Sequence, residues 1–190
     1  MSDTKSSMSL SIGSQAKDFN LPDANGTMHK LDDIKGENGT LIIFMCNHCP
    51  FVIHYFKYFK QLENICNKNK INIIGINAND FTKYTQDTPE KMLETKQKVG
   101  FNFTYLVDES QQTAKNYDAR CTPDLFLFDE NLNLYYAGQI DDSRPTNKIE
   151  VSGKDIERAI NDLISKNPST KPQNPSLGCN IKWKQGNEPH

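Results

Sequence analysis

The segment from Leu41 to Pro50 constrains the fold of this chain more than any other. Five consecutive apolar residues, Leu41 to Met45, are followed by Cys-Asn-His-Cys-Pro. An apolar run of this length is typical of a strand that is covered on both faces. A proline directly after it suits the first turn of a helix. The chain is therefore expected to pass from a buried strand into a helix, with two cysteines at the junction.

The rest of the chain alternates short apolar runs with segments of helical periodicity. Strands are predicted at 71–76, 105–107, 125–128 and 134–136, and helices at 50–67, 89–99, 110–117 and 154–165. Near the N-terminus, Asn25-Gly26 separates two short extended segments and predicts a tight hairpin. Strands that alternate with helices in this way indicate an α/β layer fold.

Length and composition indicate one globular domain. The 190 residues are 36% apolar and carry a formal charge of −2, so a basic surface for nucleic acid is not expected. No apolar stretch reaches the ~20 residues that a membrane helix needs, and the first residues lack the pattern of a secretory signal. We expect a cytoplasmic protein with a disordered segment at 1–11, a domain at 12–166 and a tail at 167–190.

The two cysteines of the CNHC segment are the strongest functional signal. Five cysteines is an odd number without a regular spacing, which argues against a disulfide scaffold and favours redox chemistry. Cys49 precedes Pro50 and is predicted at the helix N-cap, where unpaired N–H groups favour a thiolate. Cys46 is close enough along the chain to form a disulfide with Cys49, and we predict it to be the resolving partner. This chemistry needs no cofactor and no metal.

Three segments carry a family resemblance: LIIFMCNHCPFV, GINAND and LVDESQQTAKNYDARCTPDLFLFD. They resemble the thioredoxin-like, peroxiredoxin-related superfamily (alkyl hydroperoxide reductase/thiol-specific antioxidant, or redoxin), and the closing PSLGCNIKWK is similar to a branch with the CNHCP signature. The resemblance implies a thioredoxin-like fold, with a central mixed β-sheet flanked by helices and an N-terminal β-hairpin extension. It also places Cys49 on the attacking cysteine of the family.

The same resemblance implies a substrate-binding loop at Thr122 and Pro123. There the family has a cis peptide bond and a backbone edge for an extended substrate. The donors that activate peroxide in peroxidatic members are replaced here by Cys46 and Pro123, although Arg120 is a neighbouring substitute. His48 is a secondary candidate for acid–base work, and its alternative role is that of an exposed loop histidine.

The remaining cysteines are weaker candidates. Cys66 lies on the apolar stripe of the helix predicted at 50–67 and is expected to be a core residue. Cys121 can face Cys49, where it is an alternative resolving thiol, or it can face the core. Cys179 lies in the tail, where alternating apolar residues at 181 and 183 indicate a segment that can dock as an edge strand. In that position Cys179 is a second candidate for the resolving thiol.

These features predict a cytosolic thiol–disulfide oxidoreductase. Cys49 attacks a protein or small-molecule disulfide, and a dithiol protein supplies the reducing equivalents. Two alternatives remain open: an antioxidant thiol peroxidase that uses Cys49, and a thioredoxin-fold module that binds zinc or copper through the Cys and His side chains. Neither nucleic acid nor a membrane is expected as a partner.

Overall fold

The apolar run of the CNHC segment forms the central strand of a five-stranded sheet. In the computed structural model, which describes residues 3–169 and 173–189, strand β4 (Gly39–Phe44) is buried along its whole length. It pairs in parallel with β5 (Ile71–Asn77) and antiparallel with β8 (Asp124–Asp129). The order is β6-β5-β4-β8-β9, with β6 (Thr104–Val107) and β9 (Leu134–Gly138) at the edges. This is the central mixed sheet expected from the sequence.

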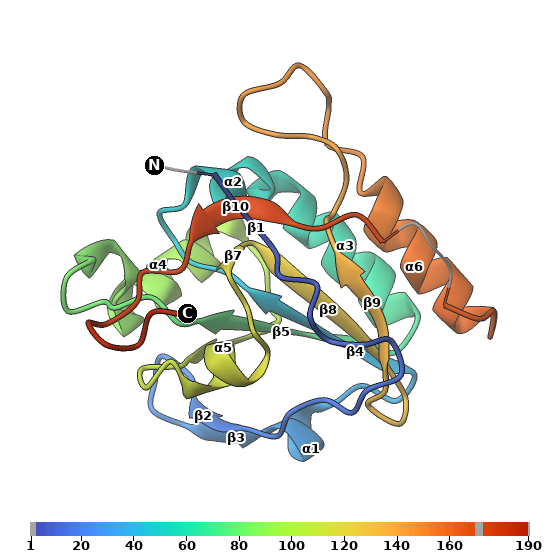
Figure 1. The fold of residues 1–190 in the computed structure, drawn as a ribbon, viewed down its shortest axis with the longest axis horizontal. Helices are drawn as coiled ribbons and strands as arrows, with labels where there is room; N and C mark the ends of the chain where they lie inside the picture. Colours follow the sequence, from blue (N-terminus) through green and yellow to red (C-terminus); the bar gives the residue numbers. More distant parts are fainter. Residues whose placement is uncertain (1–2, 170–172, 190) are drawn as a thin grey trace.

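Helices cover both faces of this sheet (Figure 1). One face packs against α2, α3, α4 and α6, while the other packs against α5, α1 and the β2–β3 hairpin. Because side chains alternate along a strand, β4 supplies Leu41 and Ile43 to the first face and Ile42 and Phe44 to the second. The bounds are α1 (Leu31–Ile34), α2 (Pro50–His54), α3 (Phe56–Lys68), the 3₁₀ helix η1 (Thr85–Asp87), α4 (Pro89–Val99), α5 (Gln112–Asn116), α6 (Lys154–Ile164), β2 (Asn20–Pro22) and β3 (Met28–Lys30).

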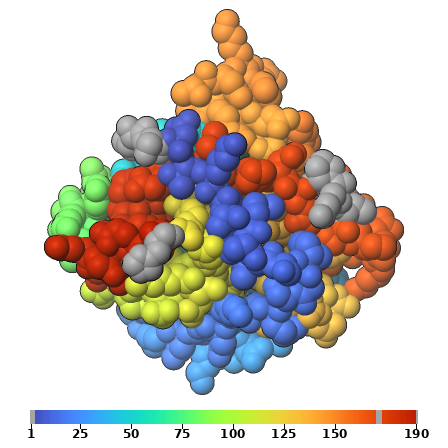
Figure 2. Space-filling model, viewed as in Figure 1, coloured from blue at the N-terminus to red at the C-terminus, as the bar shows by residue number. Residues whose placement is uncertain are grey.

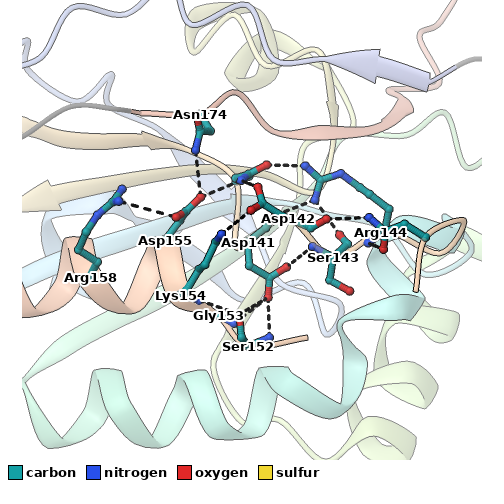
Figure 3. A network of polar contacts seen from close by, with 12 residues as sticks. Asp141, Asp142, Ser143, Arg144, Ser152, Gly153, Lys154, Asp155, Arg158 and Asn174 are labelled. Atoms are coloured by element: carbon teal, nitrogen blue, oxygen red, sulfur yellow. Dashed lines mark hydrogen bonds and ion pairs between the residues drawn. The ribbon is translucent and has the colours of Figure 1, made fainter. Parts of the chain in front are cut away.

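The helix predicted at 50–67 is divided into α2 and α3 at Tyr55. The Tyr55 hydroxyl donates hydrogen bonds to Asp141 Oδ1 (2.9 Å) and to the carbonyl oxygen of Ser143 (2.7 Å). Figure 3 shows that the Asp141 carboxylate also accepts the backbone N–H groups of Ser143, Ser152 and Gly153. One buried carboxylate therefore fixes the loop before α6 and, through Tyr55, the break that follows α2.

A second, three-stranded sheet joins the two ends of the described chain. Its order is β1-β10-β7, with β1 (Asp3–Lys5), β10 (Leu177–Asn180) and β7 (Cys121–Thr122), and both pairings are antiparallel. Figure 2 shows the blue N-terminal and red C-terminal segments side by side on the surface. Residues 1–11 were predicted to be disordered, whereas residues 3–5 pair with β10 in the structure. The reason is that a backbone edge satisfies their peptide groups, which the polar composition of the segment did not reveal.

The C-terminal segment is docked on the domain. Ile181 is fully buried and Trp183 is half-buried against the second face of the main sheet. Backbone hydrogen bonds join Ile181 N to Arg120 O (3.2 Å) and Asp80 N to Lys182 O (2.8 Å). Among the described residues, no helix combines the length and the apolar character that crossing a bilayer requires.

Candidate active site

Cys49 lies at the N-cap of α2, as the sequence predicted, with Pro50 in the first helical turn. Its sulfur is almost fully buried, since only 1% of the residue is exposed. The Sγ atom lies 3.1 Å from the carbonyl oxygen of Thr122 and 2.7 Å from Sγ of Cys179. The Thr122–Pro123 peptide bond is cis. The loop implied by the family resemblance therefore lies directly against Cys49.

The environment of Cys49 lowers the pKa of its thiol to about 2. The largest cause is a hydrogen bond with Cys179, and the second is a hydrogen bond with Cys46. The Thr122 side chain and the backbone N–H of Val52 act in the same direction, while burial opposes them. Two neighbouring thiols and a helix terminus thus hold Cys49 as a thiolate in a site that excludes water.

Cys46 is buried next to Cys49 and remains a thiol. Its Sγ atom lies 3.6 Å from Oγ1 of Thr122. Burial raises the pKa of Cys46 well above its ordinary value, and the hydrogen bond with the Cys49 thiolate and the negative charge of Asp87 raise it further. Cys46 is therefore placed to donate a hydrogen bond to the sulfur of Cys49.

His48 is held by a carboxylate that sequence reasoning missed. Its Nδ1 atom lies 2.7 Å from Oδ2 of Asp87, and its ring stacks parallel to that of Tyr84, with 5.8 Å between centroids. Asp87 is fully buried and also accepts hydrogen bonds from Asn47 N and Asn79 Nδ2, both at 2.8 Å. His48 is therefore a half-buried, oriented side chain and not the exposed loop histidine weighed as its alternative role. In the sequence, Asp87 is marked only by its position in the polar segment between β5 and α4.

Three side chains at this position could hold a metal ion. One donor atom each of Cys46, His48 and Asp87 lies within 4.8 Å of the other two. A cysteine sulfur, an imidazole and a carboxylate form a donor set that suits zinc, and Cys46 would bind it after losing its proton.

Three further side chains that the sequence singled out are Cys121, Cys66 and Arg120. Cys121 is buried in β7, and its Sγ atom lies 3.7 Å from the carbonyl oxygen of Pro123. Cys66 is fully buried in α3, as predicted, and burial raises the pKa of its thiol to about 12. The guanidinium of Arg120 forms an ion pair with Asp118 at 2.6 Å.

Comparison with known proteins assigns the family. The model of the AhpC/TSA family matches residues 12–137, which is more than half of the chain. The chain belongs to the AhpC/TSA family. The matched region contains β4, the CNHC segment and the cis-proline loop, and it ends before the C-terminal segment that carries Cys179.

A curated relative of this AhpC/TSA family member is the thiol-disulfide oxidoreductase ResA of Geobacillus kaustophilus, strain HTA426. The two sequences are 28% identical over 122 residues, which cover 64% of this chain and 66% of the relative. The match therefore spans slightly less than two thirds of the length of ResA.

Two solved structures show how much of this chain shares its fold with known proteins. An uncharacterized conserved protein from Geobacillus kaustophilus is 42% identical, with a TM-score of 0.94 and 98% of each chain covered. The thioredoxin domain of a thiol-disulfide oxidoreductase from Bacteroides vulgatus has a TM-score of 0.61 at 16% identity and covers 80% of this chain and 99% of that domain. The thioredoxin-like fold predicted from the sequence is confirmed. The first of these structures also covers the C-terminal strand.

Proposed function

We propose that the chain is a thiol–disulfide oxidoreductase in which Cys49 is the attacking thiolate. The observation that carries this proposal is the position of Cys49 Sγ, which lies at a helix N-cap, against the cis-proline loop and beside the sulfur of Cys179. A thiolate is the form of cysteine that attacks a disulfide. The family of the chain and its likeness to ResA support the same reaction class.

The proposed reaction begins when the Cys49 thiolate attacks one sulfur of a protein or small-molecule disulfide. A mixed disulfide forms, and the other half of the substrate leaves as a thiolate that takes up a proton. A second thiol of the protein then displaces the bound half. Cys46 and Cys179 both hydrogen-bond Cys49 and are the two candidates for this step. An external dithiol protein returns the enzyme to its reduced state.

The experiment that tests this function is steady-state reduction of bis(2-hydroxyethyl) disulfide with a dithiol reductant. We expect turnover by the wild-type protein and a fall to the uncatalysed background in Cys49→Ser. Cys66→Ala is the matched control, because Cys66 is buried in α3 and has no role in the proposed reaction. Full activity in Cys49→Ser would refute the proposal.

The same assay separates a thiol peroxidase from an oxidoreductase. Hydrogen peroxide replaces the disulfide while the dithiol and the variants stay the same. A thiol peroxidase turns over peroxide through a Cys49 sulfenic acid. Because the charge of Arg120 is engaged with Asp118, we expect disulfide turnover to exceed peroxide turnover. The opposite order would assign the peroxidase function.

Zinc binding is the second candidate function, and the cluster of Cys46, His48 and Asp87 is the observation that favours it. Cobalt(II), added to the reduced protein as a spectroscopic probe, should give a thiolate charge-transfer band that Asp87→Asn weakens. A spectrum without this band at millimolar cobalt would eliminate this candidate.

The cytoplasm is the compartment that we propose for this activity. The proposal is supported by the odd number of cysteines, because thiols without a pairing framework persist in a reducing environment. Cell fractionation with an antibody against the chain tests it, and recovery of the protein outside the cytoplasm would contradict it.

A further inference from the structure

Strand β10 occupies the edge of the cis-proline loop. It runs antiparallel to β7, with Cys179 opposite Thr122 and Asn180 opposite Cys121. The family resemblance implied that this backbone edge pairs with an extended substrate. The chain therefore places a strand of its own, with a cysteine at the position next to the nucleophile, where a substrate strand was expected.

The sulfur atoms of this arrangement are close to bonding distance. Sγ of Cys179 lies 2.7 Å from Sγ of Cys49, whereas a disulfide bond measures about 2.05 Å. The backbone N–H of Phe51, in the first turn of α2, favours the thiolate form of Cys179, just as the N–H of Val52 favours that of Cys49. Both sulfurs thus share the start of α2.

The strand is fixed on both sides of Cys179. At Gly178 the backbones approach so closely that a Cβ atom would lie 2.0 Å from the carbonyl oxygen of Thr122. Before this point, Ser176 O accepts a hydrogen bond from Ser6 N at 2.9 Å, and after it, Lys182 N donates to Asn79 Oδ1 at 2.8 Å. Cys179 is therefore presented by an ordered strand and not by a loose tail.

We propose that Cys179 is the resolving thiol of Cys49, delivered by strand β10 along the edge of the cis-proline loop. This inference rests on the proposed function, because it needs Cys49 as the nucleophile. It deepens that function by naming the second half of the catalytic pair. Cys179 lies 42 residues beyond the end of the region that the AhpC/TSA model matches, so the family model assigns it no role.

The resolving step follows from the balance of bonds. After the first attack, Cys49 is joined to one half of the substrate. The Cys179 thiol loses its proton, and its thiolate attacks Sγ of Cys49. The Cys49–Cys179 bond forms while the bond to the substrate breaks, and the substrate half leaves as a thiolate that takes up a proton. The protein has then lost two electrons and the substrate disulfide has gained two.

The negative charge on Cys49 opposes the ionisation of Cys179 until the mixed disulfide forms. In the reduced protein the largest cause that raises the pKa of Cys179 is its hydrogen bond with the Cys49 thiolate, followed by burial. The formation of the mixed disulfide removes the negative charge of Cys49, so this cause disappears. The positive charge of Lys182 and the N–H of Phe51 then act on Cys179 without that opposition.

Cys46 is affected by the same change, because its hydrogen bond with Cys49 is also a cause that raises its pKa. The largest cause that raises its pKa is burial, which the mixed disulfide leaves unchanged, and the charge of Asp87 also remains. When Cys49 reacts, both thiols lose the effect of its charge; this effect is the largest cause of the raised pKa for Cys179, whereas burial is the larger cause for Cys46. The choice between the two candidates rests on geometry, because Sγ of Cys179 lies 2.7 Å from Sγ of Cys49 on a strand paired with the cis-proline loop.

Disulfide mapping of the wild-type protein tests the inference directly. The reduced protein receives one equivalent of bis(2-hydroxyethyl) disulfide, free thiols are alkylated, and trypsin is added. Cys46 and Cys49 lie in the tryptic peptide 36–57, and Cys179 lies in 167–182. We expect a cross-link between these two peptides, which persists in Cys46→Ser. A disulfide within 36–57, with Cys179 alkylated, would overturn the inference.

A half-reaction assay separates this inference from the function on which it rests. We expect Cys179→Ser to release one equivalent of mercaptoethanol, to accumulate the mixed disulfide on Cys49 and to lose turnover. Cys46→Ser should complete the cycle without accumulating it. If Cys179→Ser turns over like the wild type while Cys46→Ser accumulates the mixed disulfide, Cys46 resolves and the proposed function stands. If Cys49→Ser releases mercaptoethanol at the wild-type rate, the proposed function itself fails.

Discussion

Nδ1 of His48 lies 2.7 Å from Oδ2 of Asp87, so a side chain of the CNHC segment is oriented by a buried carboxylate from the 3₁₀ helix before α4. Asp87 also binds the backbone N–H of Asn47. Asp87, which lies outside the CNHC segment, therefore holds the loop that carries Cys46 and Cys49.

Replacing this carboxylate tests its role. We expect Asp87→Asn to lower the free energy of unfolding by about 1–3 kcal/mol, because buried polar partners lose charge-assisted hydrogen bonds. The pKa of Cys46 should fall, since the charge of Asp87 is one of the causes that raise it. Urea unfolding and alkylation of Cys46, located by mass spectrometry, measure both effects. Asp32→Asn is the control, because Asp32 is exposed; equal behaviour of the two variants would contradict this account.

The reactivity of Cys49 should depend little on pH. Its thiol pKa lies near 2, so the thiolate persists from pH 5 to pH 8 and the rate of alkylation by iodoacetamide should stay nearly constant. A free thiol with a pKa of about 8.5 would gain roughly 1000-fold over the same range. In Cys179→Ser the largest cause of the lowered pKa is altered, and we expect the profile to move toward higher pH. A wild-type profile like that of a free thiol would be evidence against the assignment of Cys49.

Asp124 should make stability depend on pH. The residue follows the cis-proline loop, and burial raises its carboxyl pKa from 3.8 to about 7. Between these values the unfolded chain has lost the proton that the folded protein keeps, so the free energy of unfolding falls as the pH rises. A shift of this size bounds the effect at about 4 kcal/mol.

The variant Asp124→Asn cannot titrate at this position. Its free energy of unfolding, relative to that of the wild type, should therefore increase from pH 5 to pH 8 in urea titrations. The comparison within each pH cancels the other titrating groups, and Asp32→Asn again serves as the control. A constant difference between variant and wild type would show that Asp124 does not retain its proton in the folded state.

The docking of β10 should depend on Ile181, which is fully buried two residues after Cys179. We expect Ile181→Ala to lower the free energy of unfolding by about 2–5 kcal/mol, as truncations of buried side chains do. A looser β10 weakens the hydrogen bond between Cys179 and Cys49, so the pKa of Cys49 should rise. Ile12→Ala, at a residue that is 44% exposed, is the matched control. Loss of stability without a change in the pKa of Cys49 would separate the packing of β10 from the site.

The sequence by itself determined the elements around the nucleophile. The apolar run at 41–45 predicted β4, and Pro50 predicted the helix start that places Cys49 at an N-cap. Both conclusions depend on neighbouring residues, because hydrophobic periodicity and the backbone restrictions of proline act over one or two turns of chain. Thr88 likewise stands directly before a proline, Pro89, and caps α4 by accepting a hydrogen bond from Lys91 N.

Only the tertiary structure decided which side chains meet Cys49 and its loop. Asp87 lies 39 residues from His48, and Cys179 lies 130 residues from Cys49, so no local pattern records either contact. The sequence showed that the tail can form a strand, but the register that sets Cys179 opposite Thr122 depends on where β7 leaves an open edge. The sequence of a strand shows which side chains alternate between its two faces, but it does not show which strand it pairs with. The pairing partner is selected when the chain packs, by backbone hydrogen bonds and by the burial of Ile181.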